Sequence, residues 1–328
     1  MEHSPVAPPL TIATNLWFGS PNAERLTAGT HALREAYSAH NGADVHEQYV
    51  DCSVPGASSL DAAMHGVTNQ ESAARGTTAR AAIHGIRNFA QYKAAFTNLR
   101  DTLNAKKPAR VTLLGGGCAA TLAVIPYLVR LHPGMRLIWI DAHGDLNTPD
   151  TSRSGYIHGM ALGILLDPAS YGLFFADRGT MDPARVALAG QKELDPAEAL
   201  YAAAADITTL PLSARFEHAL HEFLGESEFL APHESPGVPE TSGGTDQRSP
   251  VYVHIDLDVL SPRAYLNPKC SIDTGPDIDG LANTLNLLAR HANVVGCSIA
   301  ENFETDARKV RQLVEALTGN SGKELRQV

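Results

Sequence analysis

Two apolar runs that each end in polar residues at spacings of two constrain this chain most. The runs and the residues that follow them are Leu137–Ile140 with Asp141, His143 and Asp145, and Val251–Ile255 with Asp256 and Asp258. Each run has the character of a buried strand in a parallel sheet. Strand side chains repeat every two residues, so a backbone that stays extended would send each polar set to one side.

These polar sets predict a metal site when they are taken together. The first set alone can also be a solvated turn or a helix cap. The second set favours metal binding, because carboxylates gathered in one place repel one another and raise one another's pKa unless a cation is present. We therefore expect the two strand ends to share one or more metal ions.

The order of the remaining segments predicts the fold class. Apolar runs indicate strands at Leu10–Phe18, Val111–Leu114, Leu137–Ile140, Val186–Ala189, Val251–Ile255 and Val294–Ala300. Helical spacing and helix-start residues occur between them, at Asn22–Tyr37, Ile83–Leu103, Ala119–Leu131, His158–Leu166, from Asp195 onward, and at Ile278–His291 and Asp306–Leu317. This alternation predicts a three-layer α/β/α fold with a central parallel sheet covered on both faces. We expect a single domain over residues 1–328, with a flexible insertion at about 225–249 that is rich in Pro, Gly, Ser and acidic residues.

In such a fold, ligands bind at the carboxyl ends of the strands. The chemically capable residues at those ends are Cys118, Asp141, His143, Asp145, Asp256, Asp258 and Glu301. Cys118 follows a turn, Gly115–Gly117, that lacks the spacing of a phosphate-binding loop. Its glycines can instead let the backbone pass close to another segment and bring Cys118 to the same edge. The alternative is that Cys118 is a small buried hydrophobic residue.

Charge and composition favour a small-molecule partner. The net charge is -10 and there is no run of Lys or Arg, which argues against nucleic acid or an anionic membrane surface as the main partner. No apolar run has the length of a membrane span, and the N-terminus lacks a basic region followed by an apolar one, so we expect a cytoplasmic protein. The 4 cysteines are widely spaced, as expected for free thiols or a single ligand rather than a disulfide framework.

Three motifs in this order resemble those of the ureohydrolases, the arginase and agmatinase family. They are Gly116-Gly117-Cys118, Asp141-Ala-His143-Gly-Asp145 and Asp256-Leu-Asp258. The resemblance implies a metal-dependent hydrolase of linear amidines with two Mn2+ ions. By resemblance, Asp141 and Asp256 bridge the ions, Asp145 and Cys118 complete one, and His143 and Asp258 complete the other. The family has His where this chain has Cys118, and a thiolate suits Zn2+ or Fe2+ better than Mn2+.

Further residues resemble the substrate-binding positions of arginases. The resemblance implies that Asn147 and Ser154 bind the substrate α-carboxylate and that Asp195 and Glu198 bind its α-amino group. It also implies that Glu301 binds the guanidinium, that His158 is the proton shuttle and that Asp145 accepts a hydrogen bond from the attacking hydroxide. Asp195 and Glu198 also have a purely structural explanation, since they stand where helix starts favour acidic residues.

Two departures point to a particular branch of the family. Cys118 replaces the usual His, and Tyr156 replaces an Asn. Both resemble the branch that hydrolyses Nω-hydroxy-L-arginine to hydroxyurea and ornithine, although that branch lacks the shuttle histidine that His158 would provide. We expect cleavage of an arginine-like amino acid, arginine or Nω-hydroxy-L-arginine, to ornithine with urea or hydroxyurea. The alternatives are another guanidino or formimidoyl substrate, or a catalytically silent ligand-binding relative. The sequence leaves open whether the protein is a monomer or a homo-oligomer.

Overall fold

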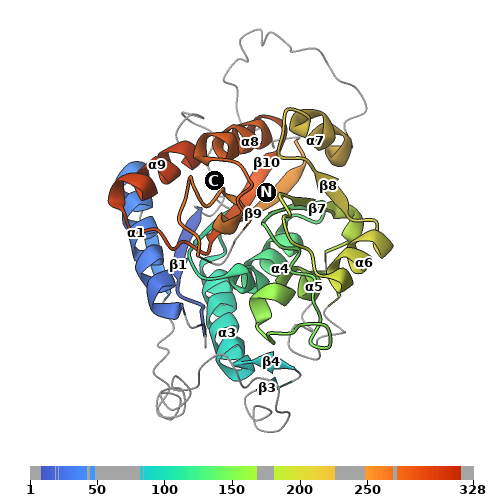
Figure 1. Cartoon of the computed structure of the whole chain (residues 1–328). Coiled ribbons are helices and arrows are strands. Elements are labelled where there is room, and N and C mark those ends of the chain that lie inside the picture. Colours follow the sequence, from blue (N-terminus) through green and yellow to red (C-terminus); the bar gives the residue numbers. More distant parts are fainter. Residues whose placement is uncertain are drawn as a thin grey trace, which may run out of the picture.

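The computed structural model describes residues 9–18, 20, 22–42, 45–48, 82–83, 85–167, 181–225, 248–268 and 272–318 (Figure 1). Most of the expected insertion at 225–249 lies outside these residues, as do Cys52 and Cys270. Of the described cysteines, Cys118 and Cys297 are free thiols. No helix within the described ranges is long and apolar enough to cross a membrane.

Within the described residues, eight strands form one parallel sheet in the order β2-β1-β5-β10-β9-β6-β7-β8. Their bounds are β1 Leu10–Thr14, β2 Val45–Gln48, β5 Val111–Leu114, β6 Arg136–Ile140, β7 Val186–Ala189, β8 Thr208–Leu210, β9 Pro250–Asp256 and β10 Asn293–Ala300. A separate antiparallel pair consists of β3 Ala82–Ile83 and β4 Ile86–Arg87. The prediction of a central parallel sheet is confirmed.

Helices cover both faces of the sheet. The α-helices are α1 Ala23–Asn41, α3 Phe89–Lys106, α4 Thr121–Leu131, α5 Ala161–Leu166, α6 Pro196–Ala204, α7 Phe216–Leu224, α8 Ile278–His291 and α9 Ala307–Thr318. Short 3-10 helices are η1 Cys118–Ala120, η2 Ile157–Met160, η5 Pro183–Arg185 and η6 Leu257–Val259. Figure 1 shows α1, α9, α8 and α7 along one side of the sheet and α3, α4 and α5 on the other.

The two faces carry separate apolar cores, which is why the strands are apolar throughout. In β6, Leu137 and Trp139 pack into the core shared with α3, α4 and α5. Ile138 and Ile140 pack into the core shared with α1, α7, α8 and α9. Both sets are fully buried, so the strand has no polar face. The three-layer α/β/α prediction is therefore confirmed.

Several local predictions were wrong in extent or kind. The first strand ends at Thr14; beyond it Leu16 and Phe18 pack in the core on the α3–α5 face of the sheet, and Trp17 packs with Leu26 and Phe303. The segment 83–88 is not the start of a helix, because β3 and β4 occupy it and α3 begins only after Asn88 at a positive φ of 54°. β2, β8 and α7 were not predicted; β2 has one apolar residue among its four and β8 has three residues, so neither carries a clear strand pattern.

The glycine turn after β5 fixes the start of α4 against its neighbours. Gly115 has a φ of +74°, and a Cβ built there would lie 2.2 Å from Thr30 Oγ1 on α1. Its N–H donates to the carbonyl of Ile299 at 2.8 Å, and the carbonyl of Gly116 accepts from the N–H of Glu301 at 3.1 Å. The expected close approach of the backbone is present, and it places Cys118 beside the end of β10.

We predict that Gly115→Ala lowers the free energy of unfolding by about 2–4 kcal/mol, because it adds a clash with Thr30 to the cost of a left-handed conformation. Gly42→Ala is the matched control, since Gly42 has a similar φ of +60° and a Cβ added there would meet nothing within 4 Å. It should cost only about 1 kcal/mol. Urea denaturation of the two variants measures the difference, and equal losses would show that the contact with Thr30 contributes nothing.

Candidate metal centre and its pocket

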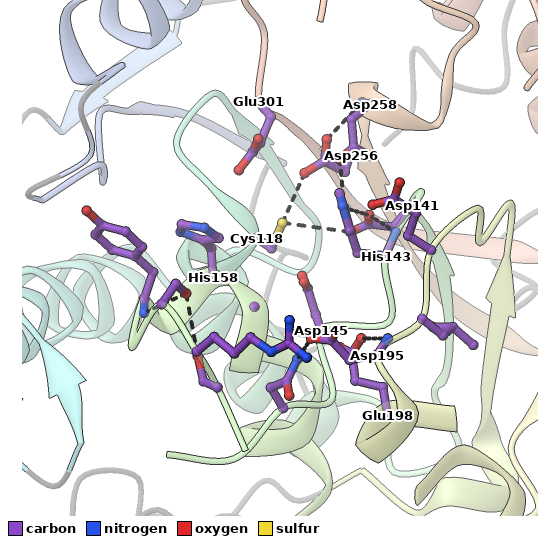
Figure 2. A pocket seen from close by; sticks show the side chains of 18 of the residues that line it. Cys118, Asp141, His143, Asp145, His158, Asp195, Glu198, Asp256, Asp258 and Glu301 are labelled. Carbon is purple, nitrogen blue, oxygen red and sulfur yellow. Dashed lines mark hydrogen bonds and ion pairs between the residues drawn. The ribbon is translucent and has the colours of Figure 1, made fainter. Parts of the chain in front are cut away.

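The carboxyl ends of four adjacent strands, β5, β10, β9 and β6, open into one pocket of about 460 Å³ (Figure 2). Every site residue expected from the sequence lines it: Cys118, Asp141, His143, Asp145, Asn147, Ser154, Tyr156, His158, Asp195, Glu198, Asp256, Asp258 and Glu301. The structure thus brings the expected metal-binding and substrate-binding residues together. Figure 2 shows Cys118 grouped with Asp141, Asp256 and Asp258, with His158 to one side and Asp195 to the other.

The acidic residues converge through turns rather than through an extended backbone. β6 ends at Ile140, and Asp145 has a φ of +52°, so the backbone does not stay extended through Asp141, His143 and Asp145. Asp141 Oδ1 accepts a hydrogen bond from the N–H of His143 at 2.7 Å. Asp256 Oδ1 accepts one from the N–H of Asp258 in the same way, at 2.9 Å. Each aspartate therefore bends the chain two residues on, as Asx turns do, and folds the next ligand-type side chain back toward it.

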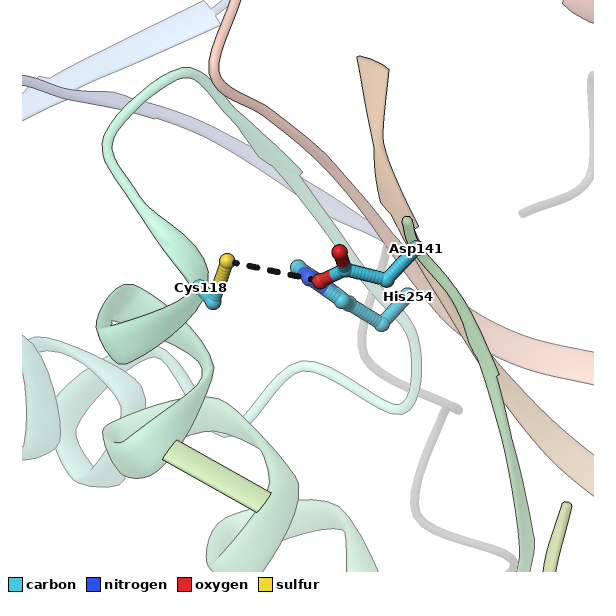
Figure 3. Close-up of side chains that lie close together, drawn as sticks. All are labelled: Cys118, Asp141 and His254. Atoms are coloured by element: carbon cyan, nitrogen blue, oxygen red, sulfur yellow. Dashed lines mark hydrogen bonds between the residues drawn. The ribbon is translucent and has the colours of Figure 1, made fainter. Parts of the chain in front are cut away.

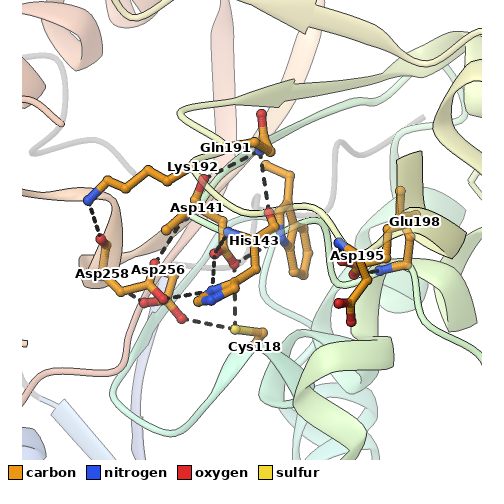
Figure 4. A network of polar contacts seen from close by, with 12 residues as sticks. Cys118, Asp141, His143, Gln191, Lys192, Asp195, Glu198, Asp256 and Asp258 are labelled. Atoms are coloured by element: carbon orange, nitrogen blue, oxygen red, sulfur yellow. Dashed lines mark hydrogen bonds and ion pairs between the residues drawn. The ribbon is translucent and has the colours of Figure 1, made fainter. Parts of the chain in front are cut away.

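His143 lies between two carboxylates at the outer end of the cluster (Figure 4). Its Nδ1 is 2.9 Å from Asp258 Oδ2 and 3.5 Å from Asp141 Oδ1. Hydrogen bonds with Asp141 and Asp258 raise the pKa of His143. Burial would raise the pKa of Asp258, but its hydrogen bond and charge interaction with His143 hold that pKa below the usual value. The second oxygen of Asp258 accepts from the N–H of Ala142 at 3.0 Å, which fixes the carboxylate in place.

Cys118 lies at the inner end of the cluster. Its side chain is buried, and Sγ lies 3.1 Å from Asp256 Oδ2 and 3.8 Å from Asp141 Oδ2. Burial and then the negative charges of the surrounding carboxylates raise the pKa of this thiol well above its usual value. The group is therefore a thiol unless a cation compensates the charge, and a metal ion would convert it to the thiolate.

Asp145 supplies direct evidence that the cluster needs a cation. Its carboxylate is buried, and its Oδ2 has no hydrogen-bond partner among the residues that the structure describes. Burial and the charge of Asp141 raise its pKa well above the usual value. Burial and the charge of Asp258 likewise raise the pKa of Asp141 to about 7. Buried carboxylates packed this closely are costly without an ion.

The donor set fits divalent cations. The ligand atoms of Asp141, His143 and Asp258 lie within 4.8 Å of one another, as do those of Cys118, Asp256 and Glu301. Carboxylate oxygen, imidazole nitrogen and thiolate sulfur are the protein donors for divalent first-row transition metals. Two adjacent groups of this kind can hold two ions that share carboxylates.

One wall of the pocket is formed by the start of α6, where hydrogen bonds connect Asp195 and Glu198 to the segment after Asp145. Asn147 Nδ2 donates to Asp195 Oδ2 at 3.1 Å. Glu198 is buried, and its two carboxylate oxygens accept from the backbone N–H groups of Leu146 at 3.0 Å and Asp195 at 2.9 Å. These bonds favour the structural explanation for Glu198, which fixes the segment after Asp145 against the start of α6. Asp195 remains both a helix-start residue and a candidate ligand of a substrate amino group.

The opposite wall is a group of aromatic rings around His158. Tyr156 stacks on His158 with ring centroids 5.3 Å apart and an interplanar angle of 13°. Trp17 meets His158 edge-on at 6.5 Å, and the guanidinium of Arg87 lies over the Tyr156 ring at 5.1 Å. Ser154 is exposed, and its Oγ accepts from the N–H of Tyr156 at 3.3 Å. The imidazole of His158 is thereby oriented at the side of the pocket.

Sequence reasoning missed several residues around the centre. Trp139 Nε1 donates to Asp141 Oδ2 at 3.2 Å, and Lys192 Nζ donates to the carbonyl of Asp258 at 2.9 Å. His254 is buried beneath the cluster, and Arg153 lines the mouth of the pocket. The period of two along β9 puts His254 on the same side as Asp256, which was a usable signal. No pattern in the sequence singles out Lys192 or Arg153.

Arginases and an Nω-hydroxy-L-arginine amidinohydrolase are among the curated proteins that this chain resembles. The chain is 28% identical over 181 residues to an Nω-hydroxy-L-arginine amidinohydrolase of Streptomyces lavendulae, which is 52% of this chain and 56% of that protein. It is 26% identical over 216 residues to an arginase of Schizosaccharomyces pombe, 63% of this chain and 57% of that protein. The matches thus span about half the length of these curated relatives.

Solved structures share the fold over nearly the whole chain. An arginase from Bacillus caldovelox matches with a TM-score of 0.68 and 18% identity, over 96% of this chain and 99% of that one. A formimidoylglutamase from Bacillus subtilis matches with a TM-score of 0.58 and 16% identity, over 97% and 88%. The model of the arginase family matches residues 27–303, which include every strand from β2 to β10 and all the residues of the candidate metal centre. The chain therefore belongs to the arginase family.

Proposed function

We propose that this protein is a two-metal amidinohydrolase that cleaves the guanidino group of an arginine-like amino acid. The observation that carries the proposal is the buried cluster of acidic residues, with an imidazole and a thiol, at the floor of a pocket that also presents Asn147, Asp195 and His158. The family and its relatives support the same chemistry. The products would be ornithine with urea, or ornithine with hydroxyurea.

The cluster would hold two divalent ions. We propose Mn2+, because this is the ion that the resemblance to the arginase family implies. By resemblance to the family, Asp141 and Asp256 would be shared; Asp141 lies within 4.8 Å of the donor atoms of both His143 and Cys118. Cys118 and Asp145 would complete one ion, and His143 and Asp258 the other. When bound, the ions supply the positive charge that lowers the pKa of a water molecule and makes it nucleophilic near neutral pH.

The chain's own residues would orient the reactants and move protons. A guanidinium is a poor electrophile, so the attacking water must be held beside it. The buried Asp145 carboxylate would accept the hydrogen bond of that water, and Glu301 would pair with the guanidinium. His158 would donate a proton to the leaving amine, a role for which an imidazole is chemically suited. Asn147, Ser154 and Asp195 would hold the amino-acid end.

Two features favour Nω-hydroxy-L-arginine over arginine as the substrate. Cys118 takes the place of an imidazole, and the Tyr156 ring covers a face of His158. An N-hydroxy group lowers the basicity of a guanidine, so proton delivery by His158 would matter less for that substrate. The relative from S. lavendulae is named as an amidinohydrolase of this compound.

Arg153 favours a second candidate, hydrolysis of a formimidoyl or guanidino compound with an additional carboxylate. Its side chain lines the pocket mouth, where its permanent charge could bind such a group. The B. subtilis formimidoylglutamase shares the fold. Turnover of a dicarboxylate substrate but of neither arginine nor hydroxyarginine would favour this candidate.

The proposed function is tested with metal-loaded protein and two substrates offered separately. We expect ornithine from Nω-hydroxy-L-arginine and, more slowly, from L-arginine. His158→Ala should lower kcat with arginine by about 100-fold or more, because the leaving amine loses its proton donor. With hydroxyarginine the loss should be much smaller.

The matched control for the shuttle role is Glu301→Gln, which should impair both substrates because each needs its guanidino group placed. Ornithine, urea and hydroxyurea are measured for each variant. Equal losses in His158→Ala with the two substrates would contradict the proposed role of this histidine. Absence of ornithine from both substrates would contradict the function itself.

The ligand role of Cys118 has a direct measure in metal content. Cys118→Ala should remove about one metal equivalent per chain, whereas Cys118→His should keep two. The control is Cys297→Ala, which removes a thiol that hydrogen-bonds to Thr112 within the sheet and lies outside the pocket. It should leave two equivalents. Elemental analysis after dialysis decides, and two equivalents in Cys118→Ala would exclude ligation by this residue.

The buried carboxylates predict an unusual pH dependence for the metal-free protein. Asp141, Asp145 and Asp256 have raised pKa values, so the folded state binds more protons than the unfolded state above about pH 4. Stability should therefore fall as the pH rises from about 4 toward 7, where Asp141 titrates. Two groups act in the opposite direction: Asp258, whose lowered pKa matters only below its usual value of 3.8, and His254, whose pKa is lowered from 6.5 to about 3 and which therefore favours folding as the pH rises through this range. The three carboxylates outnumber His254, so the net change with rising pH is a loss of stability.

Thermal unfolding of chelator-treated protein across this pH range gives the measurement. The metal-loaded protein is the control, and it should lose much less stability over the same range because the ions compensate the charges. Each unit of pKa shift corresponds to about 1.4 kcal/mol. A metal-free protein that becomes more stable between pH 4 and pH 7 would contradict the electrostatic account.

A further inference from the structure

A buried histidine beneath the metal centre has no place in the function proposed so far. His254 lies in β9, two residues before Asp256, and it is fully buried. Its ring packs against Trp139 with centroids 3.8 Å apart and an interplanar angle of 35°. Neutral histidines can be ordinary core residues, so the contacts of the two ring nitrogens decide what this one does.

The two nitrogens of His254 differ sharply in their surroundings. Nδ1 lies 2.7 Å from Ser298 Oγ on β10, a short hydrogen bond. Nε2 is buried and has no hydrogen-bond partner among the residues that the structure describes. A neutral imidazole has one N–H and one lone pair, and the tautomer with its N–H at Nε2 would leave a buried donor without an acceptor among the described residues. With Nδ1–H donating to Ser298, that lone pair is on Nε2.

The imidazole of His254 lies on the thiol side of the centre (Figure 3). Ligand atoms of His254, Cys118 and Asp141 all lie within 4.8 Å of one another. The figure shows the tip of the imidazole next to the Asp141 carboxylate, on the side that faces Cys118. Donor atoms bound at about 2.0–2.3 Å to one Zn2+ ion lie about 3–4 Å from one another. Cys118 Sγ is 3.8 Å from Asp141 Oδ2 and 3.1 Å from Asp256 Oδ2, so these atoms are spaced like donors around one ion.

We propose that His254 Nε2 is an additional ligand of the ion on the Cys118 side. This inference rests on the metal centre proposed above and extends its ligand set to Cys118, Asp141, Asp145, Asp256 and His254. The bond between Nδ1 and Ser298 then has the usual role of a supporting hydrogen bond, which fixes the tautomer and orientation of a ligating imidazole.

A nitrogen donor beside a thiolate changes which ion this position takes. Thiolate and imidazole together favour Zn2+, Co2+ or Fe2+ over Mn2+. The other position is surrounded by Asp141, Asp258 and His143, a harder donor set that suits Mn2+. The two positions would thus differ in metal preference, with the softer ion at Cys118.

The test is titration of the metal-free protein with Co2+, read by absorption rather than by activity. A cobalt–thiolate charge-transfer band reports the ion at Cys118, and the visible bands report its coordination. We expect His254→Asn to weaken binding of the band-forming ion by more than about 100-fold, beyond the loss typical of a supporting residue, and to change the visible bands. The Asn side chain is too short to place an atom at the position of Nε2, while it can still bond to Ser298.

The matched control is Ser298→Ala, which removes the same hydrogen bond but keeps the imidazole. It should weaken binding by no more than about 100-fold and leave the visible bands in place. An unchanged spectrum and affinity in His254→Asn would overturn ligation by His254 while leaving the metal centre intact. A wild-type protein that binds no Co2+ would overturn the centre itself, and the two failures are therefore distinguishable.

A second measurement needs no variant, should His254→Asn fail to fold. Crystals of the wild-type protein loaded with Zn2+, measured at the zinc absorption edge, would place the ion at Cys118 by anomalous scattering. The ion should lie about 2.0–2.1 Å from Nε2 of His254. An ion bound by Cys118 but more than about 3 Å from that nitrogen would overturn the proposal.

Discussion

Mutual repulsion among buried carboxylates is the constraint on which the rest of this structure depends. Asp141, Asp145, Asp256, Asp258 and Glu301 are each less than 5% exposed, and they come from segments that are far apart in the sequence. The sheet holds them together because its apolar strands are buried on both faces and end at one edge. The cohesion of the core therefore opposes the repulsion at the site. Binding of cations would relieve that repulsion and add its free energy to that of folding.

The sequence predicted the layers of the fold well, because the signal for a doubly covered strand is strong. A short, fully apolar run such as Leu137–Ile140 fits a buried strand, and the parallel sheet follows from the alternation of such runs with helices. Prediction failed where local pattern and tertiary contact disagree. Residues 83–88 have helical spacing, yet Arg87 donates its N–H to Gly155 and the segment forms a hairpin. That contact joins segments about seventy residues apart and leaves no trace in local periodicity.

The candidate site was predictable in its membership but not in its geometry. Acidic residues after apolar runs indicate where carboxylates gather, yet Asp145 reaches the pocket through a left-handed backbone that no spacing rule anticipates. The role of Glu198 could not be separated from helix capping until its two oxygens were seen on backbone N–H groups. His254 was overlooked for a related reason, because a histidine inside an apolar strand has the pattern of an ordinary core residue.

The acidic pocket also affects how molecules arrive and leave. Glu193 and Asp195 line it near the mouth, away from the buried cluster, on a chain with a net charge of -10. A negative field of this kind raises the encounter rate of small cations, over a reach of about 8 Å at physiological ionic strength. The same field would slow the departure of ornithine, the cationic product that we propose. Salt would therefore weaken capture and speed release, which makes the ionic strength of the surroundings a control on turnover that no single side chain determines.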